Sequence, residues 1–491
     1  MTEFLTQNLH TPRSNRLVWS ALAAVLLMNA SLGLWHTYAL RVYQSSDEMR
    51  HVKYARIVAD GKLTTIKRTA AANHPPLYYY LAGKIIRNYE VKKNRKTGVR
   101  EARHLSVFFG TLGILYIFLI LRLLCRGRPE PALLGALLVA SLPAYANVCA
   151  SVANDALGLL VSYALIHAAL VGILKGPSGR WLVVLTFWCV AAGLTRLSTG
   201  LLVPPAVALF CTGYLFHRED AIGKRIKVGI LVGLGVAVVV LLSCGWFYLR
   251  NHELYGDFTG AKTLIKKFRH VPKGSPLEVF FNPSKYLLLY DHGWVRLAGR
   301  FKYDGVLVIW IRMMALPAMG CLLLVFAARR RIFTRAFWSS RTAVIAVSIV
   351  VFFVAVLGPL AIFHGKGGSI HTRYALSVAW IPAGAIALGA FQLSKRFVPS
   401  LLATMIVLAT TWVHETYALV RLKKAVRKFP IEETIQRSKL RDESLMTTFI
   451  WMAALALALT LTIMVIQQAR SERGHRRSDG ASDESLMDTV A

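Results

Sequence analysis

The chain has 491 residues, of which 55% are hydrophobic, and its mean hydropathy is +0.47. Its 59 Lys and Arg residues far outnumber its 25 Asp and Glu residues, so the formal net charge is +34. Apolar runs of about 20 residues recur along the sequence, and each is long enough to cross the hydrocarbon core as a helix. This composition excludes a soluble globular protein.

The apolar segments predict an all-α polytopic membrane protein with about twelve spans, since backbone polar groups must be paired within the lipid. In chain order the segments are 17–40, 105–124, 131–149, 156–174, 181–195, 201–216, 228–249, 306–328, 343–363, 375–391, 401–420 and 447–468. Residues 1–468 therefore form one transmembrane domain. Residues 469–491 are charged and rich in Ser, which predicts a disordered tail.

Lys and Arg residues predict the orientation of these spans. Arg13 and Arg16 precede the first span, and the clusters 224–227 and 329–331 fall on the same side by parity. The positive-inside rule then puts both termini in the cytoplasm of a multi-pass protein of the cell inner (plasma) membrane. The first span has no small-residue cleavage site, so it is read as a signal anchor.

The first extracytoplasmic loop, 41–104, predicts two juxtamembrane helices on the outer surface. Apolar residues recur at helical intervals from Ser46 to Gly61, with Asp47 in the first turn, where a carboxylate suits the helix dipole. Pro75-Pro76 opens a second amphipathic stretch over 77–86. Its three tyrosines are typical of a water–lipid interface.

A second long extracytoplasmic loop covers 250–305, and both long loops are basic. Two explanations stand side by side. In the first explanation, the cations attract anionic lipid head groups or reflect a general basic bias of the sequence. In the other they bind phosphate.

The acidic pair Asp47-Glu48 is the first candidate for chemistry. Adjacent helical residues point in different directions, so the two do not form a glycosidase-like carboxylate pair. One could act as general base while the other binds a neighbour or a metal. The alternative is a solvated acidic helix start.

Two further candidates flank short turns at the same predicted face. Asp155 leads into the fourth span, and the alternative to a role in a site is a helix cap. Arg196 lies between two short apolar runs, where a charge is costly unless it meets water or a partner. If both runs span, Arg196 lies level with Asp47. A re-entrant pair would change the parity downstream, and the basic cluster 329–331 argues against it.

Later outer segments add two groups of polar residues. Arg250 follows the seventh span and Asp257 lies in a Gly-Asp turn; either could anchor a span or form a turn. The glycine-rich run 364–374, with His371 and Arg373, could cradle a phosphate. Its alternative is a flexible loop with an interfacial anchor. The sequence shows no Ser-His-Asp constellation, dinucleotide motif or metal-binding His/Cys cluster.

The order of these motifs resembles the GT-C superfamily of membrane glycosyltransferases, particularly the protein-mannosyltransferase-like and aminoarabinose-transferase-like group. The resemblance covers nearly the whole chain. It rests on Asp47-Glu48, the HPPLYY run at 74–79, Asn154-Asp155, Thr195-Arg196, Arg250-Asn251, Tyr255-Gly256-Asp257 and Arg373-Tyr374. The run at 74–79 combined with the upstream acidic pair is its most specific part.

The resemblance implies a GT-C-like bundle that takes a sugar from a polyprenyl phosphate and transfers it with inversion to an extracytoplasmic lipid, glycan or protein. Asp47 corresponds by position to the catalytic residue, the general base. The residues implied in substrate binding are Glu48, His74, Tyr78, Lys84, Asp155, Arg196, Arg250, Asp257, His371, Arg373 and Tyr374. Among them Arg373, Arg196 and Lys84 are the candidates for the phosphate. No metal site is assigned, although Asp155 and Glu48 could hold a divalent cation.

Two other readings remain at this point. A transporter or lipid flippase would also have about twelve spans, but transporters concentrate ionisable residues near the membrane midplane. Here the candidate charges gather at one outer surface. The third reading is a non-catalytic scaffold with the same fold.

Overall fold

The computed structural model describes residues 12–282 and 340–394, apart from 41, 44, 46, 126, 270, 369 and 370. Every regular element in these ranges is an α-helix or a 3-10 helix, with no strand among them. The all-α fold class is therefore confirmed. The predicted spans at 306–328, 401–420 and 447–468 and the predicted tail lie outside the described residues.

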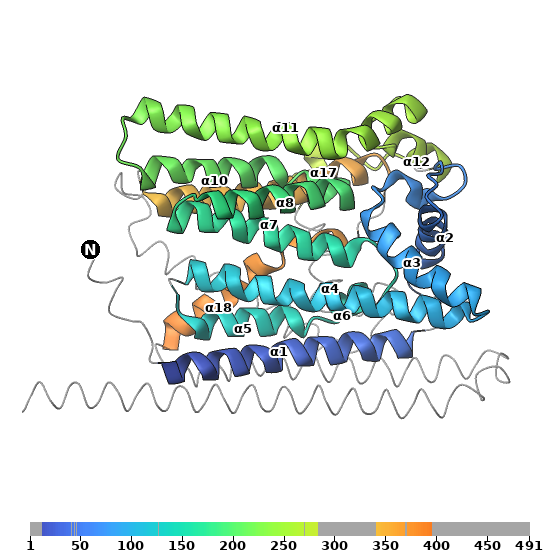
Figure 1. The fold of residues 1–491 in the computed structure, drawn as a ribbon, viewed down its shortest axis with the longest axis horizontal. Coiled ribbons are helices and arrows are strands. Elements are labelled where there is room, and N and C mark those ends of the chain that lie inside the picture. Colours follow the sequence, from blue (N-terminus) through green and yellow to red (C-terminus); the bar gives the residue numbers. More distant parts are fainter. Residues whose placement is uncertain are drawn as a thin grey trace, which may run out of the picture.

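Long helices run side by side along one axis and form the bundle (Figure 1). Six described segments are long and apolar enough to cross a membrane, which makes the chain a multi-pass membrane protein. They lie in helices α1 (Pro12–Ala39), α4 (Arg95–Leu124), α7 (Asp155–Lys175), α9 with α10 (Leu197–Gly200 and Val203–His217), α11 (Ile222–Tyr255) and α17 (Arg341–Gly365).

Within the described residues, shorter apolar helices account for the other predicted spans. The segment 131–149, predicted as a single helix, is instead broken into α5 (Pro129–Ala140) and α6 (Pro143–Cys149). Pro143 explains the break, because proline lacks the N–H that a continuing helix needs and suits the first turn of a new one. The segment 375–391 begins with the 3-10 turn η5 (Leu376–Val378) and continues as α18 (Trp380–Ser394).

Helix α8 (Gly179–Thr195) and helix α10 run in opposite directions along the bundle (Figure 1). They meet through α9 at the turn that contains Arg196. Their arrangement agrees with two crossings rather than a re-entrant pair, and it puts Arg196 at the end of the bundle where α7 begins.

The core centres on α7, which is buried along nearly its whole length. Helices α4, α8 and α10 pack around it. Glycines let neighbouring helices approach: Gly110 of α4 leaves room for Cys149, and its carbonyl accepts a hydrogen bond from the Tyr145 hydroxyl at 2.7 Å. The first residue of α7, Asp155, is therefore set on a rigid support.

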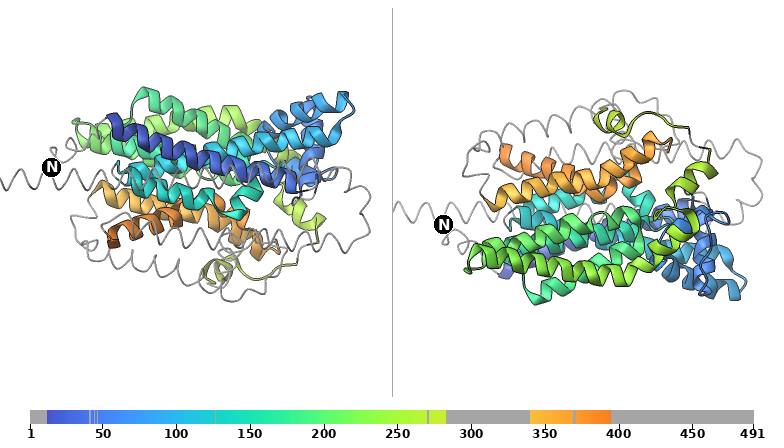
Figure 2. Two further views of the ribbon diagram at one scale, coloured as in Figure 1. Left: turned by 90° about the horizontal axis from the view of Figure 1, so that it is seen from below. Right: turned by 90° about the horizontal axis from the view of Figure 1, so that it is seen from above.

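Helices α2 (Glu48–Ala59) and α3 (Leu77–Val91) cap one end of the bundle, with the 3-10 turn η2 (Ala70–Asn73) between them. Figure 2 shows this segment at the same end in two further views. The two juxtamembrane helices were predicted here. Gly83 lets α3 press against the Ala55 carbonyl of α2, with no room for a Cβ.

The interfacial role predicted for the three tyrosines of α3 is wrong for two of them. Tyr78 and Tyr79 are fully buried, and only Tyr80 is exposed. Both hydroxyls have hydrogen-bond partners inside the protein, which offset the cost of removing them from water. Tyr78 shares a hydrogen bond with Ser106 at 2.7 Å and Tyr79 with His51 at 2.7 Å.

The start of the second long loop lies at the same end (Figure 1). Helix α11 continues to Tyr255, beyond the boundary predicted at 249, and ends at Gly256 with φ 67°. The short helices α12 (Ala261–Lys267) and α13 (Pro276–Phe281) follow.

Candidate active site

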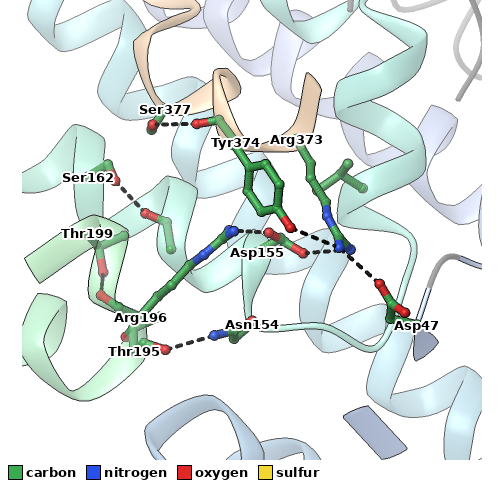
Figure 3. Close-up of polar contacts among 12 residues, drawn as sticks. Asp47, Asn154, Asp155, Ser162, Thr195, Arg196, Thr199, Arg373, Tyr374 and Ser377 are labelled. Atoms are coloured by element: carbon green, nitrogen blue, oxygen red, sulfur yellow. Dashed lines mark hydrogen bonds and ion pairs between the residues drawn. The ribbon is translucent and has the colours of Figure 1, made fainter. Parts of the chain in front are cut away.

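Four charged side chains from four separate segments meet at the capped end of the bundle (Figure 3). They are Asp47 before α2, Asp155 at the start of α7, Arg196 between α8 and α9, and Arg373 in the 3-10 turn η4 (Thr372–Tyr374). We call them the charged quartet. All four were candidates from the sequence.

Arg373 links the two aspartates of the quartet. Its Nη2 donates to Asp47 Oδ2 at 3.0 Å, and its Nη1 lies 3.7 Å from Asp155 Oδ2. Arg196 pairs with the other oxygen of Asp155, Oδ1, through its Nη1. The charges therefore alternate in sign, which stabilises each of them away from bulk water.

The backbone aims Asp47 into this site. Asp47 has φ 62°, a left-handed conformation that few residues other than glycine adopt, although Asp adopts it more readily than most. Its side chain does not cap α2. Instead Oδ2 faces Arg373, and Oδ1 accepts a hydrogen bond from Arg50 Nη1 at 2.8 Å. Asp47 is thus more than a solvated helix start.

Electrostatics keep Asp47 ionised. Burial works to raise the pKa of its carboxyl, but Arg373, with smaller contributions from His51 and Arg50, outweighs burial and holds the pKa below its usual value. For Arg373, burial opposes the charge, while Tyr374, Asp155 and Asp47 raise the pKa above its usual value. A carboxylate and a guanidinium therefore face one another at neutral pH.

Tyr374 holds both guanidinium groups of the quartet. Its ring centroid lies 4.8 Å from Arg196 Cζ and 5.2 Å from Arg373 Cζ. Cation–π contacts of this kind are made more often by guanidinium groups than by ammonium groups. Arg373 Nε is buried and makes no hydrogen bond within the described part of the chain. One donor of Arg373 is thus still available to a ligand.

Glu48 points away from Asp47, into the protein. Its side chain is fully buried and pairs with the fully buried Arg103 of α4, at 2.7 Å from Nε and 2.6 Å from Nη2. Arg103 Nη1 also donates to the carbonyls of Thr37 and Leu40. The backbone N–H of Val152 donates to Glu48 at 3.0 Å. This ion pair positions Asp47 on one side and the turn before Asp155 on the other.

A second contact fixes the turn before α7. Asn154 Nδ2 donates to the carbonyl of Thr195 at 2.9 Å. Because Asp155 and Arg196 directly follow these two residues, the hydrogen bond brings their side chains together (Figure 3).

Aromatic rings form a wall beside the quartet. The rings of His51, His74 and Tyr79 are nearly parallel and lie in a triangle, with the His51 centroid 6.0 Å from that of His74 and 5.8 Å from that of Tyr79, and the latter two 6.5 Å apart. Burial lowers the pKa of His51 to about 4 despite the opposing charge of Asp155, and burial also holds the pKa of His74 well below its usual value. Both imidazoles are therefore neutral at neutral pH. Tyr54 donates to the His74 carbonyl at 3.2 Å.

Several predicted site residues lie elsewhere. The hydroxyl of Tyr78 meets Ser106, and Lys84 lies on the exposed side of α3, with its ammonium 5.3 Å from the Tyr80 ring centroid. Arg250 donates to the Thr64 carbonyl at 2.8 Å. Within the described part of the chain, none of these three side chains makes a hydrogen bond or ion pair with the quartet.

Asp257 and His371 also have local roles. Asp257 accepts hydrogen bonds from the N–H groups of Thr259 at 2.8 Å and Lys262 at 3.0 Å, which orders the turn before α12. His371 is exposed, with its ring 6.0 Å from that of Tyr374. From the described part of the glycine-rich loop, Arg373 and Tyr374 are the residues that reach the quartet.

Sequence reasoning missed Arg103, His51 and Tyr79. Arg103 had a usable signal, since an arginine at the start of an apolar helix requires an internal partner. His51 follows Asp47 by four residues, the spacing of one helical turn. Within the described ranges, no three His, Cys, Asp or Glu side chains are placed to hold a metal ion.

Comparison with known proteins gives one family match. Residues 73–246 match the family model described as dolichyl-phosphate-mannose-protein mannosyltransferase, which is about a third of the chain. This segment contains His74, Asp155 and Arg196. No curated protein matches the chain.

The chain is similar to solved structures of other membrane proteins. ArnT from Cupriavidus metallidurans bound to undecaprenyl phosphate aligns with a TM-score of 0.50 and 17% identity, over 93% of this chain and 78% of that one. The apo state of the same ArnT aligns with a TM-score of 0.45 and 19% identity, over 90% and 76%. The archaeal oligosaccharyltransferase AglB from Archaeoglobus fulgidus, in complex with an inhibitory peptide and a dolichol-phosphate, gives 0.38 and 12%, over 93% and 56%.

The matched segment and the shared architecture confirm the resemblance expected from the sequence motifs. The chain is a multi-pass membrane protein with the fold of the GT-C membrane glycosyltransferases.

Proposed function

We propose that this protein transfers a sugar from a polyprenyl-phosphate donor to an extracytoplasmic acceptor, with inversion at the anomeric carbon. The observation that carries the proposal is the contact between Asp47 and Arg373, at 3.0 Å. It joins an ionised carboxylate, suited to act as base, to a buried cation with a donor to spare, suited to bind phosphate. The undecaprenyl phosphate bound by the ArnT of the same fold supports the donor class.

In the proposed reaction, Asp47 removes the proton of an acceptor hydroxyl. The hydroxyl oxygen attacks the anomeric carbon, and the bond from that carbon to the phosphate oxygen breaks. Its electron pair leaves with the lipid phosphate. A phosphate leaving group needs neighbouring cations rather than a proton, which is the role of Arg373 and Arg196. A single displacement inverts the anomeric carbon.

Donor binding would also prepare the base. In the structure Arg373 is shared between Asp47 and Asp155. A donor phosphate competes with these carboxylates for the same guanidinium. When Arg373 turns to the phosphate, Asp47 loses the neighbour that lowers its pKa most, and it becomes the stronger base. Proton removal is thereby favoured once the donor is in place.

Other residues would support this centre. Glu48 and Arg103 keep Asp47 and the turn before Asp155 in place. Tyr374 holds the two guanidinium groups over its ring. His51 and His74, both neutral, form an aromatic wall suited to the face of a sugar ring.

We infer the orientation from α1 together with the basic residues before it. This helix leads from the N-terminal segment to the end of the bundle where Asp47 lies (Figure 1). If the N-terminus is cytoplasmic, as Arg13 and Arg16 predict, the charged quartet faces the extracytoplasmic side. A quartet at one end of the bundle favours an enzyme over a transporter, in which ionisable residues gather near the midplane.

The test is transfer of radiolabelled sugar from a polyprenyl-phosphate donor in membranes of a deletion strain that carries the wild-type or a variant gene. Asp47→Asn should lower transfer about 10²- to 10⁴-fold, the usual contribution of a general base. Asp60→Asn is the matched control, because Asp60 lies in the same loop but pairs with Arg87. Full transfer by Asp47→Asn would refute the assignment.

A further inference from the structure

A group of cations lies next to Asp47, and one of them, Arg50, contacts the Asp47 oxygen that Arg373 does not. It comprises the first turns of α2, the loop that follows α2, and the end of α12, which lie together at the capped end of the bundle (Figure 1). We call this group the basic cluster. Its exposed members are Arg50, Lys53, Lys67, Arg68, Lys266, Lys267 and Arg269.

Three contacts hold the segments of the basic cluster together. The Arg50 guanidinium lies 4.8 Å from the ring centroid of Phe268. Lys267 Nζ donates to the Lys67 carbonyl at 3.1 Å, and Thr69 Oγ1 donates to the Arg50 carbonyl at 3.0 Å. The cations thus belong to one surface, although they are separated by about 200 residues in sequence.

Few carboxylates of this chain are placed to neutralise the basic cluster. Residues 47–104 contain 14 Lys and Arg but 5 Asp and Glu. Three of these carboxylates are committed to cations elsewhere, in the pairs Glu48–Arg103, Asp60–Arg87 and Glu90–Arg56. Among the described residues, Arg50 is the one member of the cluster that pairs with a carboxylate, and its partner is Asp47.

The two oxygens of Asp47 therefore face two cationic regions. Oδ2 faces Arg373, the proposed site of the donor phosphate, at 3.0 Å. Oδ1 faces Arg50, the nearest member of the basic cluster, at 2.8 Å. In an inverting transfer the base contacts the acceptor hydroxyl, which attacks from the side opposite the leaving phosphate. With Oδ2 directed at Arg373, the acceptor would approach Asp47 from the side of Oδ1 and Arg50.

We propose that the basic cluster binds an anionic acceptor, one that carries several phosphate or carboxylate groups beside the hydroxyl to be glycosylated. The inference rests on the proposed function and names the acceptor class for that site. Like charges gathered on one surface repel one another, and an anionic partner relieves this repulsion and is drawn to it. The anionic groups bind the cluster and bring the hydroxyl to Asp47.

The test measures binding of a fluorescent linear polyphosphate to the full-length protein in nanodiscs of zwitterionic phosphatidylcholine at low salt. The cluster variant carries Lys53→Gln, Lys67→Gln and Lys266→Gln. The control variant carries Lys92→Gln, Lys93→Gln and Lys96→Gln, which removes equally exposed charges at the turn between α3 and α4. Folding is checked by size-exclusion chromatography and by a Lys→Arg version of the cluster variant, which should bind normally.

The cluster variant should bind the polyphosphate about a hundredfold more weakly, at roughly fivefold per lost charge. The control variant should change by about threefold or less. Added polyphosphate should also inhibit sugar transfer by the control at lower concentration than it inhibits the cluster variant. Equal loss in both variants would overturn the proposal, since the attraction would then be diffuse.

A second arm separates an acceptor site from a membrane-facing surface. If the cluster variant binds polyphosphate normally but loses affinity for vesicles that contain phosphatidylglycerol, its partner is the membrane and the proposal is wrong. Polyphosphate binding needs no turnover, so Asp47→Asn should bind the probe at least as tightly as the wild type, because Arg50 would lose its carboxylate partner. Failure of the base assignment is thus distinguishable from failure of the acceptor inference.

Discussion

Replacement of Arg103 by methionine should destabilise the protein strongly, because it would strand the buried carboxylate of Glu48. Both side chains are fully buried, so solvent does not weaken their attraction. The substitution removes two hydrogen bonds to Glu48, at 2.7 and 2.6 Å, and two to the carbonyls of Thr37 and Leu40, at 2.9 and 2.7 Å. Glu48 would retain the N–H groups of Tyr43 and Val152 as its donors.

The expected cost is about 3–5 kcal/mol, the range for breaking a buried ion pair by removal of one partner. The double variant Glu48→Gln/Arg103→Met removes both charges and keeps an amide oxygen for Val152. It should regain about 2–3 kcal/mol relative to the sum of the single variants. Unfolding can be measured by titration with sodium dodecyl sulfate in mixed micelles, followed by tryptophan fluorescence.

Arg100→Met is the matched control, three residues earlier on the same helix. Arg100 lies over the Tyr38 ring at 5.7 Å and is partly exposed, so its loss should cost less than about 1 kcal/mol. The reasoning is refuted if Arg103→Met costs no more than Arg100→Met. It is refuted equally if the double variant costs as much as the two single variants added together.

Three other predictions concern the site and its support. Arg373→Gln should raise the Michaelis constant for the donor. Because Arg373 holds the pKa of Asp47 down, the variant should also move the acid limb of the pH profile of sugar transfer to higher pH, and an unchanged profile would contradict the contact. Lys84→Gln should leave the Michaelis constant within about twofold in the same assay, since surface charges away from the site contribute little. Gly83→Ala should destabilise the protein by about 1–3 kcal/mol by overpacking, measured as for Arg103, whereas Gly235→Ala, with open space around it, should be tolerated.

Hydropathy predicted the fold class because the length and composition of an apolar segment are enough to identify a membrane helix. The same signal could not show the break at Pro143 inside an unbroken apolar run, although proline chemistry explains it. Nor could periodicity show that Tyr78 and Tyr79 are buried. An amphipathic pattern gives the apolar face of a helix but does not show what covers that face.

Part of the candidate site could be predicted from the sequence, because charged residues are rare in and beside membrane spans and therefore stand out. Arg196 was noticed because a charge between two apolar runs is costly unless it meets water or a partner, and its partner proves to be Asp155. The contact between Asp47 and Arg373 joins residues 326 positions apart, which local pattern cannot reveal. Arg250 and Asp257 lie in a motif of the resemblance, yet they order loops rather than the quartet.

The direction of each side chain was the hardest property to foresee. Asp47 and Glu48 are neighbours, but one faces the quartet and the other a buried arginine. This separation depends on the left-handed backbone of Asp47 and on the position of Arg103 in α4. Both are products of tertiary packing, and neither follows from the composition of the first loop.

The most direct test of Asp47 as base compares donor binding with sugar transfer in one variant. Asp47→Asn in proteoliposomes should bind the polyprenyl-phosphate sugar at least as tightly as the wild type, because Arg373 would lose a competing carboxylate. Transfer by the same variant should fall at least about 10²-fold. Parallel losses of donor binding and transfer, or transfer at the wild-type rate, would contradict the role proposed for Asp47.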